Sequence, residues 1–120
     1  MATSLTGSQQ AQLAFLRSLP PKFEKIHRQT EEIATLKADE MVQRNLARSL
    51  DILRNESAGL MLSGLADVFG VMSNLARRGG GVQLKIRGLR EGLGSLKVNY
   101  EGALRSASTA VGAPEDRDET

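Results

Sequence analysis

The sequence contains no cysteine and no tryptophan, and only 3% of its 120 residues are aromatic. Without cysteine the chain can form neither a disulfide nor a thiolate metal site. A sheet protein needs more aromatic and β-branched residues, whereas leucine, isoleucine, methionine and alanine pack well in a core between helices. The composition therefore predicts an all-α protein, and the length suits a single domain.

Long hydrophobic runs and a strong net charge are also missing. No uncharged stretch reaches the roughly 18 residues that a membrane-spanning helix needs, and the first residues have neither the basic nor the apolar region of an export signal. We therefore expect a cytoplasmic protein without membrane insertion. The formal net charge of +2 does not by itself indicate nucleic acid. With one histidine and no cysteine, we expect no metal, no cofactor, no small-molecule substrate and no enzyme activity.

The spacing of apolar residues predicts helices along most of the chain. A short helix begins after Ser8 and ends at Pro20-Pro21, and further helices span roughly residues 22–36, 39–58, 65–78 and 82–106. Asp39 is the expected cap of the third helix, but one long kinked helix over 22–58 is an open alternative, because no proline or glycine interrupts that range. The last helix contains several glycines, each costing up to about 1 kcal/mol relative to alanine, so packing must stabilise it.

The predicted fold is an antiparallel (up-down-up-down) four-helix bundle with a short extra N-terminal helix. We expect the bundle to span residues 8–106. A flexible N-terminus of residues 1–7 precedes it, and a polar, disordered tail of residues 107–120 follows it.

On the predicted third helix, a helical-wheel projection separates an apolar side from a polar one. Leu46, Leu50 and Leu53 fall on the inner side. Asp51 falls on the outward side, together with three neighbours and with Arg54 at the edge; the neighbours are Arg44, Arg48 and Asn55. We expect this outward face to be basic around a single solvent-exposed carboxylate.

The segment Asp51-Ile52-Leu53-Arg54-Asn55-Glu56-Ser57 resembles the motif His-x-Leu-Lys-Gly-x-Ala of histidine-phosphotransfer (HPt) domains, with aspartate in the histidine position. Three further segments resemble the family. Met61-Leu62 stands where the family has Gly-Leu, residues 65–73 follow its Leu-Ala-x-Leu-Ala-x-x-Leu-Glu pattern in part, and residues 15–20 match Phe-Leu-x-x-Leu-Pro. The resemblance implies an HPt-like bundle.

The departures from the family motif bear on function. An HPt domain uses a neutral imidazole nitrogen to accept and return a phosphoryl group, and a carboxylate is a poor substitute. The resemblance therefore implies an HPt-like signalling protein that binds a response-regulator receiver domain or a histidine kinase in two-component signalling without carrying phosphate. The residues that it assigns to partner binding are Arg44, Arg48, Asp51, Arg54 and Asn55.

Other interpretations of the same residues stay open. The face around Asp51 can be a solvated helix surface with weak ion pairs. His27 is an alternative phospho-acceptor, although no family motif surrounds it. A generic helical adaptor, chaperone or homodimer would use the stripe of Leu65, Phe69 and Met72 against another subunit, so the chain is expected to be a monomer or a homodimer. A nucleic-acid module would use six basic residues between 77 and 97, but the missing aromatic residues argue against it; these six are Arg77, Arg78, Lys85, Arg87, Arg90 and Lys97.

Overall fold

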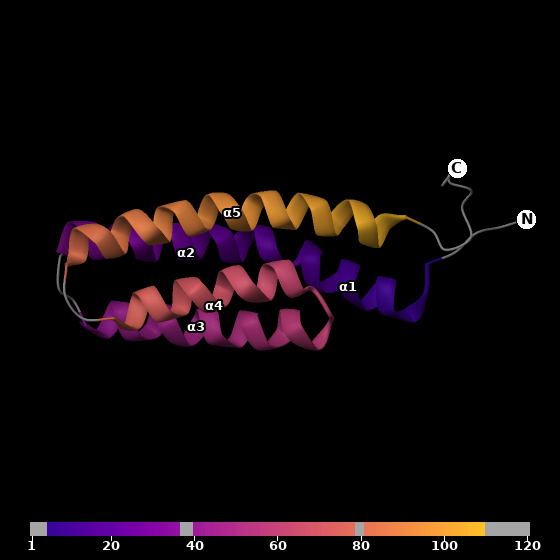
Figure 1. The fold of residues 1–120 in the computed structure, drawn as a ribbon, viewed down its shortest axis with the longest axis horizontal. Helices are drawn as coiled ribbons and strands as arrows, with labels where there is room; N and C mark the ends of the chain where they lie inside the picture. The colour runs from indigo at the N-terminus through magenta and orange to yellow at the C-terminus, as the bar shows by residue number, and fades with distance from the viewer. Residues whose placement is uncertain (1–4, 37–39, 79–80, 110–120) are drawn as a thin grey trace, which may run out of the picture.

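The computed structural model describes residues 5–36, 40–78 and 81–109. All regular structure in these ranges is helical (Figure 1). The helices are α1 (Gly7–Arg17), α2 (Leu19–Leu36), α3 (Glu40–Gly59), α4 (Ser63–Arg77) and α5 (Val82–Ser108). None of them is long and apolar enough to cross a membrane.

The first two helices form one bent helix, because only Ser18 separates α1 from α2 (Figure 1). Thr6 caps α1 through a reciprocal pair of hydrogen bonds with Gln9, so the cap lies two residues before the expected Ser8. Pro20 and Pro21 lie in the first turn of α2, where a missing N–H breaks no helical bond. The expected short extra helix is therefore the first arm of a bent helix.

The range 22–58 forms two helices. α2 ends at Leu36, α3 begins at Glu40, and the two helices pack against each other, which one continuous helix would not allow. Asp39, the expected cap of the third helix, lies outside the described residues.

A short turn joins α3 to α4. Met61 in this turn has a left-handed backbone, with φ of 61°, and the N–H of Leu62 donates to the carbonyl of Ser57 at 2.8 Å. α3 and α4 form a helical hairpin, α4 also packs against α5, and α5 lies along both α1 and α2 (Figure 1). The hairpin therefore presents one side of α3 away from the rest of the molecule.

The core consists mainly of aliphatic residues from all five helices. The largest fully buried side chains are Phe69, Leu16, Leu19, Ile26, Ile33, Leu46, Leu50, Leu65, Met72, Leu89, Leu96 and Thr30. The stripe of Leu65, Phe69 and Met72 lies in this core, so the prediction that it packs against another subunit is wrong. One amphipathic face cannot fill the core of its own chain and also bind a second one.

The ends of the helical region differ slightly from the prediction. Thr6 and Gly7 belong to the start of α1, and α5 continues to Ser108, two residues beyond the expected end. Ala107 is buried, which explains the longer helix, because its methyl group packs against the core. Residues 1–4 and 110–120, which include most of the expected flexible N-terminus and tail, lie outside the described residues.

Candidate functional site

The candidate site lies on α3, at the side that faces away from α2 and α5. Arg44, Arg48, Asp51 and Asn55 recur on this helix at spacings of four, three and four residues, so they follow one side of it. Arg44, Arg48 and Asn55 are exposed as expected. Arg44 also forms a 3.8 Å ion pair with Glu40 one turn earlier, and such an exposed pair contributes little to stability.

Asp51 lies at the contact between α3 and α4. The hydroxyl of Ser73 donates to its Oδ1 at 2.6 Å, and the guanidinium of Arg77 forms an ion pair with its carboxylate. The Nη1 of Arg77 also donates to the Ser73 hydroxyl, at 2.7 Å. Asp51, Ser73 and Arg77 thus form a closed network that joins the two helices.

The expectation that Asp51 stands free in water is not met, because only 26% of its side chain is exposed. The wheel projection placed Asp51 on the outward side of α3, but its position, about 100° from Leu50, lies on the flank of the helix. It could not show that α4 covers this flank and brings Ser73 and Arg77 to it. Both carboxylate oxygens accept hydrogen bonds, and the positive charge of Arg77 lies beside them, so the carboxylate is a weaker nucleophile than a free one.

Arg54 and Arg48 remain available to a binding partner. Arg54 is exposed, and its Cδ lies 3.2 Å from the position that a Cβ on Gly70 would occupy, so its aliphatic part runs over α4. Its Nη2 donates to Asn55 at 3.5 Å, at the limit of a hydrogen bond. No ion pair of Arg48 or Arg54 occurs within the described ranges. The face therefore carries two unneutralised positive charges.

Two exposed hydrophobic residues lie on the same side of α3 as Arg48, and sequence reasoning missed both. Ile52 is 54% exposed and Met41 is 62% exposed. The spacing of four residues between Arg48 and Ile52 could have identified Ile52 from the sequence, since residues four apart are neighbours on a helix surface. An apolar side chain among arginines is a common feature of protein-binding surfaces.

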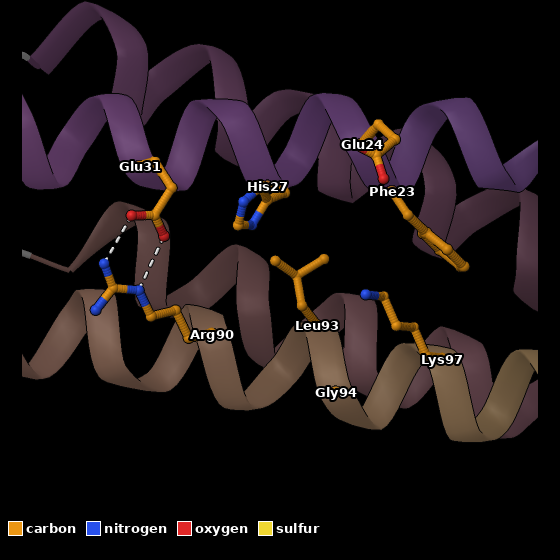
Figure 2. Close-up of a pocket in the computed structure, with 8 residues that line it drawn as sticks. All are labelled: Phe23, Glu24, His27, Glu31, Arg90, Leu93, Gly94 and Lys97. Atoms are coloured by element: carbon orange, nitrogen blue, oxygen red, sulfur yellow. Dashed lines mark hydrogen bonds and ion pairs between the residues drawn. The ribbon is translucent and has the colours of Figure 1, made fainter.

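His27 lies in a different part of the molecule, in a groove between α2 and α5 of about 460 Å³ (Figure 2). Figure 2 shows His27 and Lys97 projecting into this groove from opposite helices, with the Leu93 side chain between them. Ser57, which occupies the small-residue position of the family motif, is fully buried, and its hydroxyl has no hydrogen-bond partner. Neither residue joins the network around Asp51.

The groove also contains an ion pair with two hydrogen bonds. Arg90 donates to both carboxylate oxygens of Glu31, at 2.9 and 2.7 Å. This hydrogen bonding lowers the pKa of Glu31, and the charges of Arg90 and His27 add to the effect. The same contact raises the pKa of Arg90.

The six basic residues between 77 and 97 do not form one patch. Arg77 is paired with Asp51, Arg90 with Glu31, and Lys85 is buried with its ammonium group donating to Gln43. The remaining three are exposed: Arg78 directly follows α4, and Arg87 and Lys97 lie on α5. Half of the positive charge that a nucleic-acid interface would need is therefore engaged within the protein.

The described residues hold no group of three histidine, aspartate or glutamate side chains placed to bind a metal ion. Comparison with protein-family models, with curated proteins and with solved structures finds no match for this chain.

Proposed function

We propose that this chain is an HPt-like signalling module, built as an antiparallel (up-down-up-down) four-helix bundle. It binds the receiver domain of a response regulator or a histidine kinase through the α3 face, and it does not carry phosphate. The binding residues are those of the sequence prediction, Arg44, Arg48, Asp51, Arg54 and Asn55, with Ile52 added as an apolar contact.

The backbone at Met61 supports the register of the resemblance. HPt domains have glycine at this position, and Met61 is the one non-glycine residue with positive φ among the described residues. A left-handed backbone is the conformation that favours glycine, because other L-residues place Cβ too close to the following carbonyl. The chain thus adopts at residue 61 a backbone suited to the glycine that the family has there.

The closed network of Asp51, Ser73 and Arg77 is the single observation on which the proposal depends. A phospho-acceptor must present a free lone pair to the incoming phosphorus. Here both oxygens of the Asp51 carboxylate accept hydrogen bonds, and the ion pair with Arg77 makes the carboxylate a weaker nucleophile. The α3 face can therefore still bind a partner through its exposed arginines, although Asp51 is a poor phospho-acceptor.

The charge of that face favours an acidic partner. Arg48 and Arg54 are exposed, and Ile52 lies one turn after Arg48. Receiver domains surround their phosphorylated aspartate with further carboxylates, so arginines without internal ion pairs would steer and orient such a surface. Ile52 would add apolar contact area.

The binding test uses the full chain and a panel of purified receiver domains, with affinity measured by calorimetry. We expect at least one receiver to bind, and R48E and R54E each to weaken it by about tenfold or more. R28E, at an exposed position of α2 outside the proposed face, is the matched control and should leave the affinity unchanged. Absence of binding across the panel, or equal weakening by R28E, would overturn the proposal.

Phosphate transfer is tested separately. After incubation with a phosphorylated receiver, the chain should carry no acid-labile, base-stable phosphate, which is the signature of phosphohistidine. If such phosphate is found and H27A removes it, His27 is an acceptor and the claim that the chain carries no phosphate is wrong.

A further inference from the structure

Three apolar side chains of α4 and α5 are largely exposed to solvent. Val71 on α4 is 60% exposed, and Leu84 and Val98 on α5 are each 70% exposed. Between the helices lies a groove of about 350 Å³, lined by Val68 and other apolar residues and by the polar residues Asp67, Glu91 and Ser95. Val71 lines this groove, and an exposed apolar side chain at the edge of a groove is a feature of interaction sites.

The exposed residues of each helix form a straight line. On α5, Leu84, Glu91 and Val98 are spaced by seven residues, which is close to two helical turns. The second line runs along α4 to the residue directly after it, with spacings of four, three and four residues, so its members also share one side; they are Asp67, Val71, Asn74 and Arg78.

The midpoints of the two lines lie at the same level along the axes of α4 and α5. Glu91 is the midpoint between Leu84 and Val98, and the midpoint between Asp67 and Arg78 falls beside Met72. Met72 lies against Gly92, since its Sδ is 2.8 Å from the position that a Cβ on Gly92 would occupy. A two-fold axis across the helices at this height would therefore relate both pairs at once.

We propose that a second copy of this chain binds to the α4–α5 face around this axis. The axis places Asp67 of one copy against Arg78 of the other, and Leu84 against Val98, each contact occurring twice. This is the self-complementary pattern of an isologous dimer. No ion pair of Asp67 or Arg78 occurs within the described part of one chain.

Glu91 limits the strength of the dimer. It lies on the axis, so the carboxylates of the two copies meet there and repel each other. The dimer is therefore expected to be weak, with a dissociation constant that falls when this charge is removed by E91Q. The proposal does not depend on receiver binding, because it uses α4 and α5 and leaves the arginines of α3 exposed.

Sedimentation equilibrium over a wide concentration range tests the dimer. The wild-type chain should shift from the mass of one chain to that of two as its concentration rises. D67R and R78D should each raise the dissociation constant by about tenfold or more, and the combined D67R/R78D chain should restore dimerisation, because the charges are then exchanged on both sides.

Circular dichroism shows whether each variant is folded. E32R, at an exposed position of α2, is the matched control and should dimerise as the wild type does. L84D should abolish the dimer, and E91Q should strengthen it. A mass of one chain at all concentrations would overturn the proposal. So would a dimer that the single charge changes leave intact, or a double variant no better than the single ones.

Discussion

Arg90 on α5 donates two hydrogen bonds to Glu31 on α2, with its Nε 2.9 Å from Oε2 and its Nη2 2.7 Å from Oε1. This paired geometry fixes the relative rotation of two helices that are 59 residues apart in sequence. It also lowers the pKa of Glu31 below its ordinary value of 4.5, chiefly through the hydrogen bonding.

E31Q should lower the melting temperature slightly at neutral pH. The effect is small because the side chains of Arg90 and Glu31 are 54% and 39% exposed. Since the pKa of Glu31 is lower in the folded state, the stabilisation is complete above pH 4.5 and is lost as the pH falls through the lowered pKa. Thermal unfolding from pH 7 downward should show the difference between wild type and E31Q shrinking in acid. E32Q, next to it and exposed, should show no such difference.

The buried charge of Lys85 should lower the stability of the folded protein near neutral pH, compared with an apolar side chain at the same position. It is 6% exposed, its ammonium group donates to Gln43 and forms no ion pair with the described residues, and burial lowers its pKa. Replacing a buried charge with an apolar side chain of similar length removes the desolvation cost, so K85M should stabilise the fold by roughly 1 kcal/mol. Urea denaturation at pH 7 measures this change, and lower stability of K85M would contradict it.

The pH dependence of Lys85 has a defined sign. The unfolded state binds a proton with the ordinary pKa of 10.5, and the folded state binds it more weakly. Wild-type stability should therefore rise as the pH increases between the lowered pKa and 10.5, because the unfolded state holds more protons in that window. The advantage of K85M should shrink over the same range. K97M, at an exposed position on the same helix, is the control.

The sequence predicted most of the helices because apolar spacing depends on local geometry. Leu46, Leu50 and Leu53 recur at the spacing of an inward-facing stripe, and all three are buried. The break between α2 and α3 was ambiguous because no proline or glycine marks it. It becomes clear only from the packing of the two helices against each other.

The candidate site could be predicted only in part. The exposure of Arg44, Arg48 and Asn55 follows from their position on one helix. The surroundings of Asp51 depend on a residue 26 positions later, Arg77, and on how α4 rotates against α3. A wheel projection of one helix contains neither quantity, so it assigned to water a carboxylate that a second helix covers.

Met61 should be under backbone strain. Its φ of 61° costs a non-glycine residue about 1 kcal/mol, and its side chain, 85% exposed, loses little on removal. M61G should therefore raise the free energy of unfolding by up to about 1 kcal/mol, measured by urea denaturation. M61A keeps the Cβ and the strain, so it should stay close to wild type. Equal stability of M61G and M61A would show that the left-handed backbone carries no cost.

Gly92 and Gly94 offer a matched pair of substitutions on one helix. A Cβ on Gly92 would lie 2.5 Å from Cγ of Met72, whereas a Cβ on Gly94 would have nothing within 4 Å. Met72 is fully buried, and the contact is made by Cγ in the middle of its side chain, so an added methyl group would force a well-packed core side chain to shift. G92A should therefore destabilise the fold by about 1–3 kcal/mol.

G94A should stabilise the fold by up to about 1 kcal/mol, because alanine is the better helix former and the position is open. Urea denaturation of both variants measures the two effects under the same conditions. Opposite signs would show that glycine at residue 92 is required by the close approach of α4, while glycine at residue 94 only weakens the helix. A stabilising G92A would mean that α4 and α5 lie farther apart in solution than the contact with Met72 requires.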